Sequence, residues 1–509
     1  MKFCIHDISS NTHNRVLPGN ESERAENSAS EKQHSRQICI LRDYDIEISL
    51  DYFNLLEVAF QGNSAAVVYT DFSTSSEFEL ISDRIRLPSW SPERFLSIDY
   101  LGPVIAVDFS AISDLHEPKS AASRSSIVLT CIEDDLNVVH VAEIGYSVPF
   151  ESFQESSNSH STEVQKFLNK NRPGSIVKSE VSTWNIVSNK DIAPNLISIV
   201  IPTRGAKKSQ RSKPLVVECV RSIASQSLGN SKLEIIVVYD ADTSTKYLDE
   251  VRNLESKNIR IQLISYNPPF NFSKKCNVGA QNASGEVIIF LNDDTWLRSA
   301  DSILELAGTA MISDVGAVGA KLFFENERLQ HAGYILRQGF VGHAYFRDVD
   351  GYGPFGDLVV PHEVVGVTGA CFAQRKDVWI KTGGWDESLP AAYNDVDYCF
   401  RIRSYGYSII QNNSATLFHY ESITRNPVVK PEETALILAR WKGSMTEEPF
   451  FRTEVVNKEL GHFKGTLFQE YSRYIQTTYR HAGLSGVARI FANGFKKIIR
   501  AGSSSLSRR

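Results

Sequence analysis

A short apolar run that ends in three polar residues restricts the fold of this chain more than any other feature. Residues 286–296 read EVIIFLNDDTW, in which the run Val287–Leu291 stops at Asn292, Asp293 and Asp294. Such a run suits a strand covered on both faces of a parallel sheet, although a buried helix segment gives the same pattern. Ligands of open α/β sheets bind beyond the carboxyl ends of such strands. The two aspartates therefore either hold a hard divalent cation there or cap a surface turn.

Composition places the chain among folded proteins and excludes several classes. Its 509 residues predict two or three domains, and a net charge of −6 gives no support for a nucleic-acid partner. The sequence has no apolar run that could span a bilayer and no signal-peptide core at its start. Seven cysteines without a CxxC pair fit a reducing compartment. We therefore expect a cytoplasmic protein.

Changes in sequence character predict five regions. We expect a disordered N-terminus over 1–35, an α/β domain over 36–150, a linker and helix over 151–194, a second α/β domain over 195–455, and a helical tail over 456–509. The Ser-rich stretch 152–163 is predicted as an exposed linker, before a helix over 164–169. The strands predicted in the first domain are Cys39–Leu41, Ala66–Tyr69, Val104–Val107, Ser126–Thr130 and Val138–Val141.

Strands and helices alternate in the second domain, which favours a doubly wound, mainly parallel sheet. The predicted strands are 197–201, 234–238, 259–265 and 287–291, and the predicted helices are 215–226 and 273–282. Thr203 and Arg204 follow the first of these strands, and Asp240 and Asp242 follow the second. Side chains at carboxyl ends are suited to reading a nucleoside, although Arg204 fits a solvated surface charge equally well.

Two later stretches carry further candidates for chemistry. YNDVDYCFRIRSYGY predicts a helix with Asn394 as N-cap, Asp395 and Asp397 in its first turn, and an end near Gly406. Carboxylates there complement the helix dipole, or one of them is a general base. ATLFHYES predicts a strand that ends at His419, which is either a structural residue or a metal ligand.

Six stretches in consistent order carry a resemblance to a known family. They are PNLISIVIPTRG, EIIVVYDAD, NFSKKCNVGAQNASGEVIIFLNDDT, LQHAGYIL, VTGACFAQRKDVWIKTGGWDESLPAAYNDVDYCFRIRSYGY and LFHYES. Together they resemble a bacterial glycosyltransferase of family 2, and are similar to rhamnosyltransferase-like enzymes of cell-surface polysaccharide assembly. The resemblance covers roughly 195–455. It implies a GT-A fold, a dTDP- or UDP-linked sugar donor, a divalent metal (Mn²⁺ or Mg²⁺), and inversion of the anomeric centre.

The resemblance also assigns roles to individual residues. It implies that Asp395 is the catalytic base, with Asn394 replacing the Glu that often precedes it, and that Asn292 stands where the family has the first acid of its metal motif. The register of VVYDADT is ambiguous by one residue. The implied metal ligands are Asp294, Asn292, Asp293 and His419; the nucleotide-binding residues Thr203, Arg204, Asp240, Asp242 and Asn277; the donor-sugar pocket Thr368, Gly369 and Ala370; and the acceptor-facing residues Trp385 and Asp386.

The first domain resembles the second half of another GT-A module. The similarity lies in residues 37–73 and 87–107, without the nucleoside-binding front half. Asp43 and Asp45 in LRDYD can mimic the metal motif. Because a nucleotide crevice is missing, we expect a degenerate, non-catalytic domain.

The tail predicts an amphipathic basic helix. Residues 483–509 contain six basic and no acidic residues. The apolar residues that share one helical face are Val487, Ile490, Phe491, Phe495, Ile498 and Ile499. The segment 484–500 can lie on an anionic membrane surface, on the inner face of the plasma membrane, or dock onto the protein itself. A glycan or lipid-linked acceptor is consistent with the membrane interpretation.

Two other functions compete with sugar transfer. The chain could be an inactive scaffold that binds sugar nucleotides in a polysaccharide assembly complex. A nucleotidyltransferase is disfavoured, because no Gly-rich, Lys-containing triphosphate loop follows the first strand of the second domain. Release of a nucleoside diphosphate would separate an enzyme from a scaffold.

Overall fold

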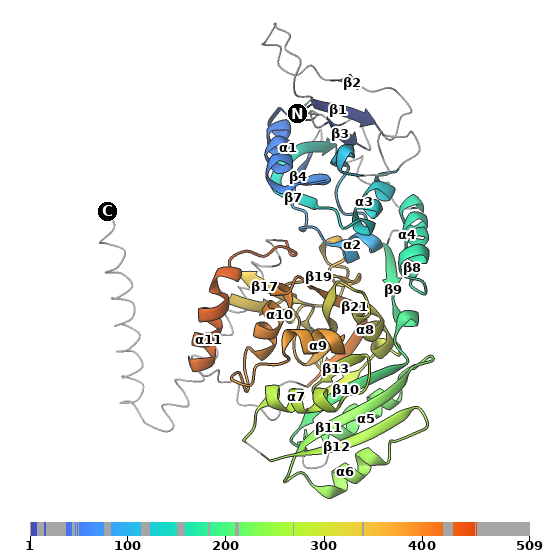
Figure 1. Ribbon diagram of the computed structural model, residues 1–509, viewed down its shortest axis with the longest axis vertical. Coiled ribbons are helices and arrows are strands. Elements are labelled where there is room, and N and C mark those ends of the chain that lie inside the picture. The colour runs from blue at the N-terminus through green and yellow to red at the C-terminus, as the bar shows by residue number, and fades with distance from the viewer. Residues whose placement is uncertain are drawn as a thin grey trace, which may run out of the picture. The chain divides into compact units, whose positions relative to one another are not determined.

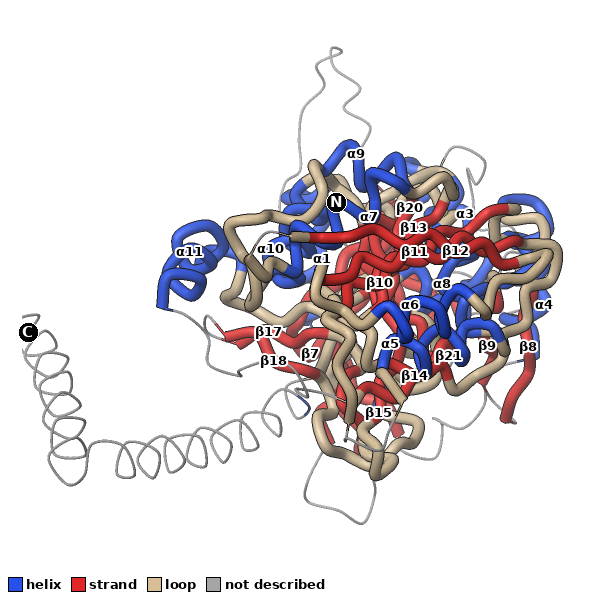
Figure 2. The backbone as a smooth tube through the Cα atoms, turned by 90° about the horizontal axis from the view of Figure 1, so that it is seen from below, coloured by secondary structure: helices blue, strands red, loops and turns tan. Residues whose placement is uncertain are grey.

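Strand β13, Val287–Leu291, is buried at every residue and lies in the middle of the larger sheet. The described strands of this sheet run in the order β12-β11-β10-β13-β20-β15-β21-β14, with β16 on β15 and β19 on β21. Neighbouring strands from β12 to β13 are parallel, whereas β20 is antiparallel to β13. Figure 2 shows β10, β11, β12 and β13 grouped together. The expected α/β fold with a mainly parallel first half is therefore confirmed.

The computed structural model describes residues 2–7, 15–16, 37–42, 46, 48, 50–75, 83–112, 123–149, 158–181, 184–208, 213–267, 269–337, 340–420, 431–452 and 455. The described chain up to Arg452 belongs to one compact unit. The predicted tail helix and the acidic pair Asp43 and Asp45 lie outside the described residues. None of the helices within these ranges is long and apolar enough to cross a membrane.

The second domain contains the larger sheet and its helices. Its strands are β10 Leu196–Thr203, β11 Lys232–Asp240, β12 Ile259–Tyr266, β13, β14 Thr295–Leu297, β15 Val315–Phe323, β16 Leu329–His331, β17 Tyr334–Arg337, β18 Phe340–His343, β19 His362–Glu363, β20 Cys371–Arg375 and β21 Ser408–His419. Its helices are α5 Leu215–Ala224, α6 Thr245–Arg252, α7 Phe272–Asn282, α8 Ser302–Ala310, α9 Lys376–Thr382, α10 Asn394–Ser404 and α11 Pro431–Trp441. Strands β17 and β18 form a separate antiparallel pair.

The first domain has its own sheet and its own hydrophobic core. Its elements are β1 Lys2–Asp7, β2 Arg15–Val16, β3 Gln37–Arg42, α1 Leu50–Asn63, β4 Val67–Ser75, β5 Asp83–Ile85, α2 Pro92–Ser97, β6 Val104–Asp108, α3 Arg124–Glu133 and β7 Val138–Pro149. The connection to the second domain consists of α4 Asn158–Asn171, β8 Ile176–Val181 and β9 Trp184–Ser188. Figure 1 shows the strands of the two domains as separate groups.

The first sheet repeats the topology of the second half of the larger sheet. Strands β3-β6-β4-β7 pair antiparallel, antiparallel and parallel, as β13-β20-β15-β21 do, and in the same order along the chain. Helices α1 and α8 follow the first strand of each set, and α3 and α10 precede the last. The resemblance of this domain to half of a GT-A module therefore has a structural counterpart.

The predicted N-terminus needs two corrections. Lys2–Asp7 is not disordered: it forms β1, which pairs in parallel with β3. This strand takes the place that β10 has beside β13, so one strand of the front half is present after all. The sequence missed it because the run Lys2–Asp7 stands in a mostly polar region.

Two predictions of local structure are also wrong. Ser126–Thr130 is part of helix α3 rather than a strand, because Ser123 accepts a hydrogen bond from the Ser126 backbone N–H as an N-cap. The linker predicted over 152–163 already contains the first residues of α4, which begins at Asn158. His160 extends the apolar stripe of this helix, since its ring is buried and contacts both Ser125 and the Phe95 carbonyl.

Buried charges join the two domains. Arg94, on α2, is fully buried, and its guanidinium donates to the Phe355 carbonyl at 2.9 Å and pairs with Asp357 at 2.5 Å. Glu363, on β19, accepts from the Glu93 backbone N–H at 3.1 Å and from the Ser91 hydroxyl. A charge removed from water in this way is stable only with its partner in place.

We predict that Arg94→Ala lowers the free energy of unfolding by about 3–5 kcal/mol, the usual cost of leaving a buried charge without its partner. Lys170→Ala is the matched control, because Lys170 forms an exposed pair with Glu133 in the same domain. That change should cost no more than about 1 kcal/mol. Urea unfolding followed by circular dichroism measures both. Equal losses would contradict a structural role for the buried pair.

Candidate functional site

The carboxyl ends of β10, β11 and β13 meet at one edge of the larger sheet. Thr203 is the last residue of β10, Asp240 the last of β11, and Asn292 follows β13 directly. Backbone pairing fixes this edge, since the Asn292 N–H donates to the Ala370 carbonyl at 3.0 Å. The arrangement brings together side chains that are 90 residues apart in the sequence.

Asp293 faces β10. Its Oδ2 accepts a hydrogen bond from the Thr203 hydroxyl at 2.5 Å, and Thr203 Oγ1 in turn accepts from the Gly205 backbone N–H at 2.9 Å. Burial, together with the neighbouring Asp294, raises the pKa of Asp293 to about 7. The structure therefore does not bring Asp293 to the other predicted metal ligands, and its carboxylate instead holds Thr203.

A buried lysine connects the ends of β10 and β11. Lys275, on α7, is fully buried, donates to the Thr203 carbonyl at 2.7 Å and forms an ion pair with Asp240. Burial lowers its pKa. Arg204 is half-exposed and lies 3.5 Å from Asp240, whereas the side chain of Asp242 is exposed. The geometry thus selects Asp240 rather than Asp242 as the aspartate at the crevice.

Asp294 faces the opposite way, toward β21. Strand β14 pairs with β21 so that Thr295 stands opposite His419, and this register places His419 Nε2 at 3.1 Å from Asp294 Oδ1. The Asn292 amide nitrogen lies 3.3 Å from the same imidazole nitrogen. Asn292 Oδ1 is buried and accepts no hydrogen bond. Burial opposes ionisation of Asp294, but His419 outweighs it and lowers the pKa of this carboxyl group.

The protonation of His419 is constrained by Gln330, on β16. Gln330 Oε1 lies 2.7 Å from His419 Nδ1, so Nδ1 carries the proton and donates. The lone pair of neutral His419 is then on Nε2, which faces the carboxylate oxygen of Asp294. Two acceptors at this distance require either a second proton or a cation between them. In metal sites, the histidine that binds the metal commonly donates its other ring N–H to a carbonyl, which fixes its tautomer.

The residues of this cluster fit a divalent cation, although they do not form a complete protein cage. Within the described ranges, no three His, Cys, Asp or Glu side chains gather in a metal-binding group. Asp294 and His419 supply two donors, and the buried Asn292 Oδ1 is an oxygen without a partner. Carboxylate, amide and imidazole donors suit Mn²⁺ and related ions, with other positions left for a ligand's oxygens.

Asp395 lies at the start of α10, separate from this cluster. Its Oδ2 accepts hydrogen bonds from the Tyr334 hydroxyl at 2.8 Å and the Gly369 backbone N–H at 2.9 Å, and Thr368 Oγ1 is 3.5 Å away. Helix α10 begins at Asn394, with Tyr393 as N-cap, so the predicted cap is displaced by one residue. Asp395 is partly exposed.

Three residues connect Asp395 with the end of β13. Thr368, Gly369 and Ala370 precede β20, and Ala370 accepts the hydrogen bond from Asn292 described above. A Cβ atom on Gly369 would lie 3.3 Å from the Trp385 ring and 3.5 Å from Asp395 Cβ. These three residues therefore connect the segment after β13 with Asp395, and their role as a donor-sugar pocket stays a prediction.

Trp385 is held in an aromatic cluster. Its side chain is buried, and its ring packs against Phe290, Phe372 and Tyr398 at centroid distances of 5.3, 5.2 and 5.0 Å. Asn277 is likewise occupied, since its amide exchanges hydrogen bonds of 2.8 and 2.9 Å with the Trp385 backbone. Both residues also line a pocket of about 580 Å³ together with Asp386, and the binding roles that the resemblance implied for them stay predictions.

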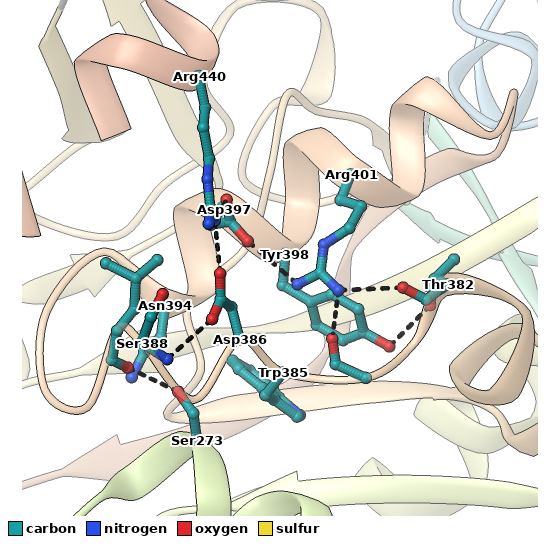
Figure 3. A network of polar contacts seen from close by, with 12 residues as sticks. Ser273, Thr382, Trp385, Asp386, Ser388, Asn394, Asp397, Tyr398, Arg401 and Arg440 are labelled. Carbon is teal, nitrogen blue, oxygen red and sulfur yellow. Dashed lines mark hydrogen bonds and ion pairs between the residues drawn. The ribbon is translucent and has the colours of Figure 1, made fainter. Parts of the chain in front are cut away.

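Asp386 lies in a network that Figure 3 shows. Its carboxylate accepts from Arg440, on α11, at 2.6 Å and from the Ser388 N–H at 2.8 Å. Asp397 is almost fully buried and accepts from Arg401 at 3.0 Å and from Arg440 at 2.9 Å. It also accepts from the Trp441 indole N–H at 2.9 Å. The network borders a pocket of about 580 Å³. Asp397 is therefore committed to structure, which favours Asp395 over Asp397 as the reactive carboxylate.

Two residues of the candidate site, Lys275 and Tyr334, were not identified from the sequence, although the sequence contains a weak signal for each. Lys275 lies on the buried face of α7 beside Cys276 and Gly279, where a charged residue is unusual without a partner. Tyr334 lies in the stretch LQHAGYIL, which was matched to the family without a role for its side chains. Neither signal specifies a partner, because Asp240 and Asp395 are distant in the sequence.

Comparison with known proteins identifies the domain that carries this site. Residues 198–382, from β10 to the end of α9, match the family described as glycosyl transferase family 2. They are a family 2 glycosyltransferase domain. The match includes both Asp240 and the sequence Asn292–Asp294, and it ends before α10 and His419.

Two curated relatives extend the similarity beyond this domain. An uncharacterised protein, y4gI, of Sinorhizobium fredii is 27% identical over 466 residues, which cover 84% of this chain and 49% of that protein. The O-antigen biosynthesis protein RfbC of Myxococcus xanthus is 26% identical over 358 residues, which cover 68% of this chain and 28% of that protein. The chain thus spans half or less of the length of these relatives.

Solved glycosyltransferase structures also resemble the chain at low TM-scores. GalNAc-T7 with UDP, GalNAc and Mn²⁺ has a TM-score of 0.39 at 13% identity and covers 49% of this chain and 48% of its own. The mannosyltransferase of Pyrobaculum calidifontis with GDP-Man and Mn²⁺ has a TM-score of 0.35 at 15% identity, over 60% and 89%. S. aureus TarS with UDP-GlcNAc has a TM-score of 0.33 at 17% identity, over 48% and 64%.

The two candidate aspartates after β11 give a direct test of the crevice. We expect Asp240→Asn to weaken binding of UDP with Mn²⁺ by about tenfold, the value of one hydrogen bond that involves a charged group. Asp242→Asn should leave the dissociation constant within about twofold, because an exposed side chain away from the crevice contributes little. Isothermal titration calorimetry measures both constants. A larger effect from Asp242→Asn would reverse the assignment.

Proposed function

We propose that the chain is an inverting, metal-dependent glycosyltransferase that moves a sugar from a dTDP- or UDP-linked donor to a glycan or lipid-linked acceptor in surface polysaccharide biosynthesis. The observation that carries this proposal is that two sets of reactive side chains contact the same short segment, Thr368–Ala370, or its neighbours. Asp294 and His419 form an acceptor pair on one side of Thr368–Ala370, and Asp395 lies on the other. One group suits the departing diphosphate, and the other suits the incoming hydroxyl.

The charges at the crevice support a role for a metal. Asp240, Asp293 and Asp294 all lie where an anionic diphosphate would bind, and Lys275 is already paired with Asp240. A diphosphate would therefore be repelled unless a cation offset these carboxylates. Asp294, His419 and Asn292 would hold it, and when bound it stabilises the negative charge that develops on the leaving group. Asp293 keeps Thr203 in place rather than binding the cation.

Asp395 is the proposed base. An acceptor hydroxyl is a weak nucleophile until its proton is removed, and a partly exposed carboxylate held by Tyr334 and Gly369 can accept that proton. Because Asp395 and the leaving-group site lie on different sides of the sugar pocket, the hydroxyl can attack in line. Direct displacement inverts the anomeric centre and needs no covalent intermediate.

We propose that the first domain is not catalytic. It repeats the strand order of the catalytic half, but Ser125 stands at the second position of α3, where α10 has Asp395. Strand β7 ends at Pro149, whereas β21 ends at His419. Neither a base nor an imidazole ligand therefore occupies the matching positions, and the domain's buried contacts with the second domain suggest that it serves as a support.

The polysaccharide context and the competing scaffold function need separate evidence. The name of RfbC refers to O-antigen biosynthesis, and the similarity to that protein supports a related pathway for this chain. Membrane contact through 484–500 stays a prediction, since this segment lies outside the described residues. A scaffold would bind sugar nucleotides without releasing nucleoside diphosphate, so turnover distinguishes it from the enzyme.

We predict that Asp395→Asn lowers the release of nucleoside diphosphate by at least about a hundredfold, the usual scale for loss of a general base. Binding of UDP with Mn²⁺ should change little, because Asp395 lies apart from the metal cluster. Turnover is measured with a panel of UDP- and dTDP-sugars in the presence of Mn²⁺ and candidate acceptors. No release from any donor by the wild-type chain would favour the scaffold, and full activity of the variant would refute the base.

A further inference from the structure

The segment from β16 to β17, Leu329–Arg337, contacts both halves of the proposed catalytic site. Gln330 holds the tautomer of His419, as described above, and His331 Nε2 accepts a hydrogen bond from the Thr368 backbone N–H at 3.2 Å. Tyr334 follows after Gly333 and donates to Asp395. One short segment therefore reaches the imidazole, the sugar pocket and the proposed base.

The backbone of this segment is fixed in one conformation. Gly333 has a φ of +101°, and a Cβ atom there would lie 2.8 Å from Val364, so a side chain is excluded by both conformation and space. The Tyr334 backbone N–H donates to the Gly366 carbonyl at 2.8 Å. The Tyr334 side chain is 6% exposed and lies against His331 and His343. The hydroxyl is therefore delivered to Asp395 from a rigid support.

The histidines around Tyr334 are neutral in this arrangement. Because His331 Nε2 accepts from Thr368, its proton is on Nδ1, which lies 2.8 Å from His343 Nδ1. Burial, followed by the proximity of His343 and His419, keeps the pKa of His331 well below its usual range. Because His331 is neutral, it places no charge beside the Tyr334 ring. The main electrostatic interaction of the Tyr334 hydroxyl is therefore with Asp395.

Tyr334 can act on Asp395 only as a donor. Burial and the nearby carboxylate raise the pKa of Tyr334 well above its usual range, so the phenol stays protonated at working pH. Cys399, one turn further along α10, is the other titratable group near Asp395, and its burial also raises its pKa. Neither group exchanges protons with the base, and Tyr334 is not a relay.

The hydrogen bonds divide the two oxygens of Asp395 between support and reaction. Oδ2 accepts from Tyr334 and from the Gly369 N–H, with Thr368 Oγ1 at 3.5 Å. Among the residues that the structure describes, Oδ1 accepts from the adjacent Val396 N–H alone, at 2.9 Å. Each carboxylate oxygen has about two lone pairs. Oδ1 thus retains the capacity to accept one further proton, and Oδ2 does not.

We propose that Tyr334 is the positioning residue of the base, and that it holds Asp395 through Oδ2 so that Oδ1 takes the acceptor proton. This inference rests on the proposed function, because it requires Asp395 to be the base. Without the phenol, the carboxylate could rotate between the Gly369 N–H and solvent. The carboxylate would also lose one of the two hydrogen bonds that hold Oδ2.

Replacement of Tyr334 by phenylalanine removes the hydroxyl and keeps the ring. We expect Tyr334→Phe to lower kcat for nucleoside diphosphate release by about tenfold, the rate equivalent of one hydrogen bond to a charged group. The KM for the sugar donor should stay within about twofold, because the change does not affect interactions that bind the ground state and the transition state equally. A loss in kcat without a matching rise in KM is the signature of a residue that positions the base.

Tyr345→Phe is the matched control. Tyr345 is also buried and donates to a carboxylate, Asp357, at 2.6 Å, but this pair lies at the junction of the two domains. We expect this variant to lose some thermal stability with no change in kcat. The comparison separates the loss of a buried phenol from the loss of one that holds the base.

Three variants measured together decide the proposal. If Tyr334→Phe keeps the wild-type kcat, Tyr334 has no positioning role. A fall in kcat that is matched by weaker binding of UDP with Mn²⁺ would also overturn the proposal, because this is the result of general structural damage. Full turnover by Asp395→Asn would instead refute the proposed base, so the two failures are distinguishable.

Discussion

Two acceptor atoms, Asp294 Oδ1 and His419 Nε2, lie 3.1 Å apart at the ends of β13 and β21. This contact depends on the sheet, because the pairing of β14 with β21 places His419 opposite Thr295. It also depends on Gln330, which directs the lone pair of His419 toward Asp294. An arrangement of this kind is stable with a proton on the imidazole, and we propose that a metal ion takes the place of that proton when a nucleotide binds. The rest of the proposed site is arranged around this exchange.

The three consecutive polar residues after β13 have separate tasks. Asp293 turns toward β10 and fixes Thr203, whereas Asp294 turns toward β21. Asn292 offers an amide oxygen where the family has an acid, so the cluster carries one negative charge fewer. The base is held on a different element, at the start of α10, by donors from β17 and from the residues before β20. In the proposed mechanism, the residues that act on the leaving group and the residue that acts on the acceptor are therefore held by different elements of the fold.

The strands could be predicted from the sequence because burial on both faces leaves unbroken apolar runs. Val287–Leu291 and Ile197–Ile201 are examples, and the carboxyl-end rule then placed Thr203 and Asp240 correctly at the crevice. The apolar run Ser126–Thr130 misled in the same way, since a Ser123 cap made it a helix. The local sequence pattern therefore predicted well where the buried segments lie along the chain, and predicted less consistently whether each segment is a strand or a helix.

The directions of the side chains could not be predicted, because they depend on partners far away in the sequence. Asp293 and Asp294 are neighbours, yet they face Thr203 and His419 respectively, 90 residues before and 125 residues after them. The resemblance named Trp385 as acceptor-facing, but it did not indicate that its ring packs against Phe290, Phe372 and Tyr398. Tyr334 lies in the family-like stretch LQHAGYIL, but that stretch does not indicate that its hydroxyl contacts Asp395.

The central claim is that His419 and Asp294 hold a divalent cation when a nucleotide binds. Pulsed electron paramagnetic resonance of Mn²⁺ in the presence of UDP tests it directly, because an imidazole ligand couples its nitrogen to the electron spin of the metal. The account predicts coupling to one imidazole nitrogen in the wild-type chain and its loss in His419→Gln. Mn²⁺ that binds together with UDP without any imidazole coupling in the wild-type chain would contradict it.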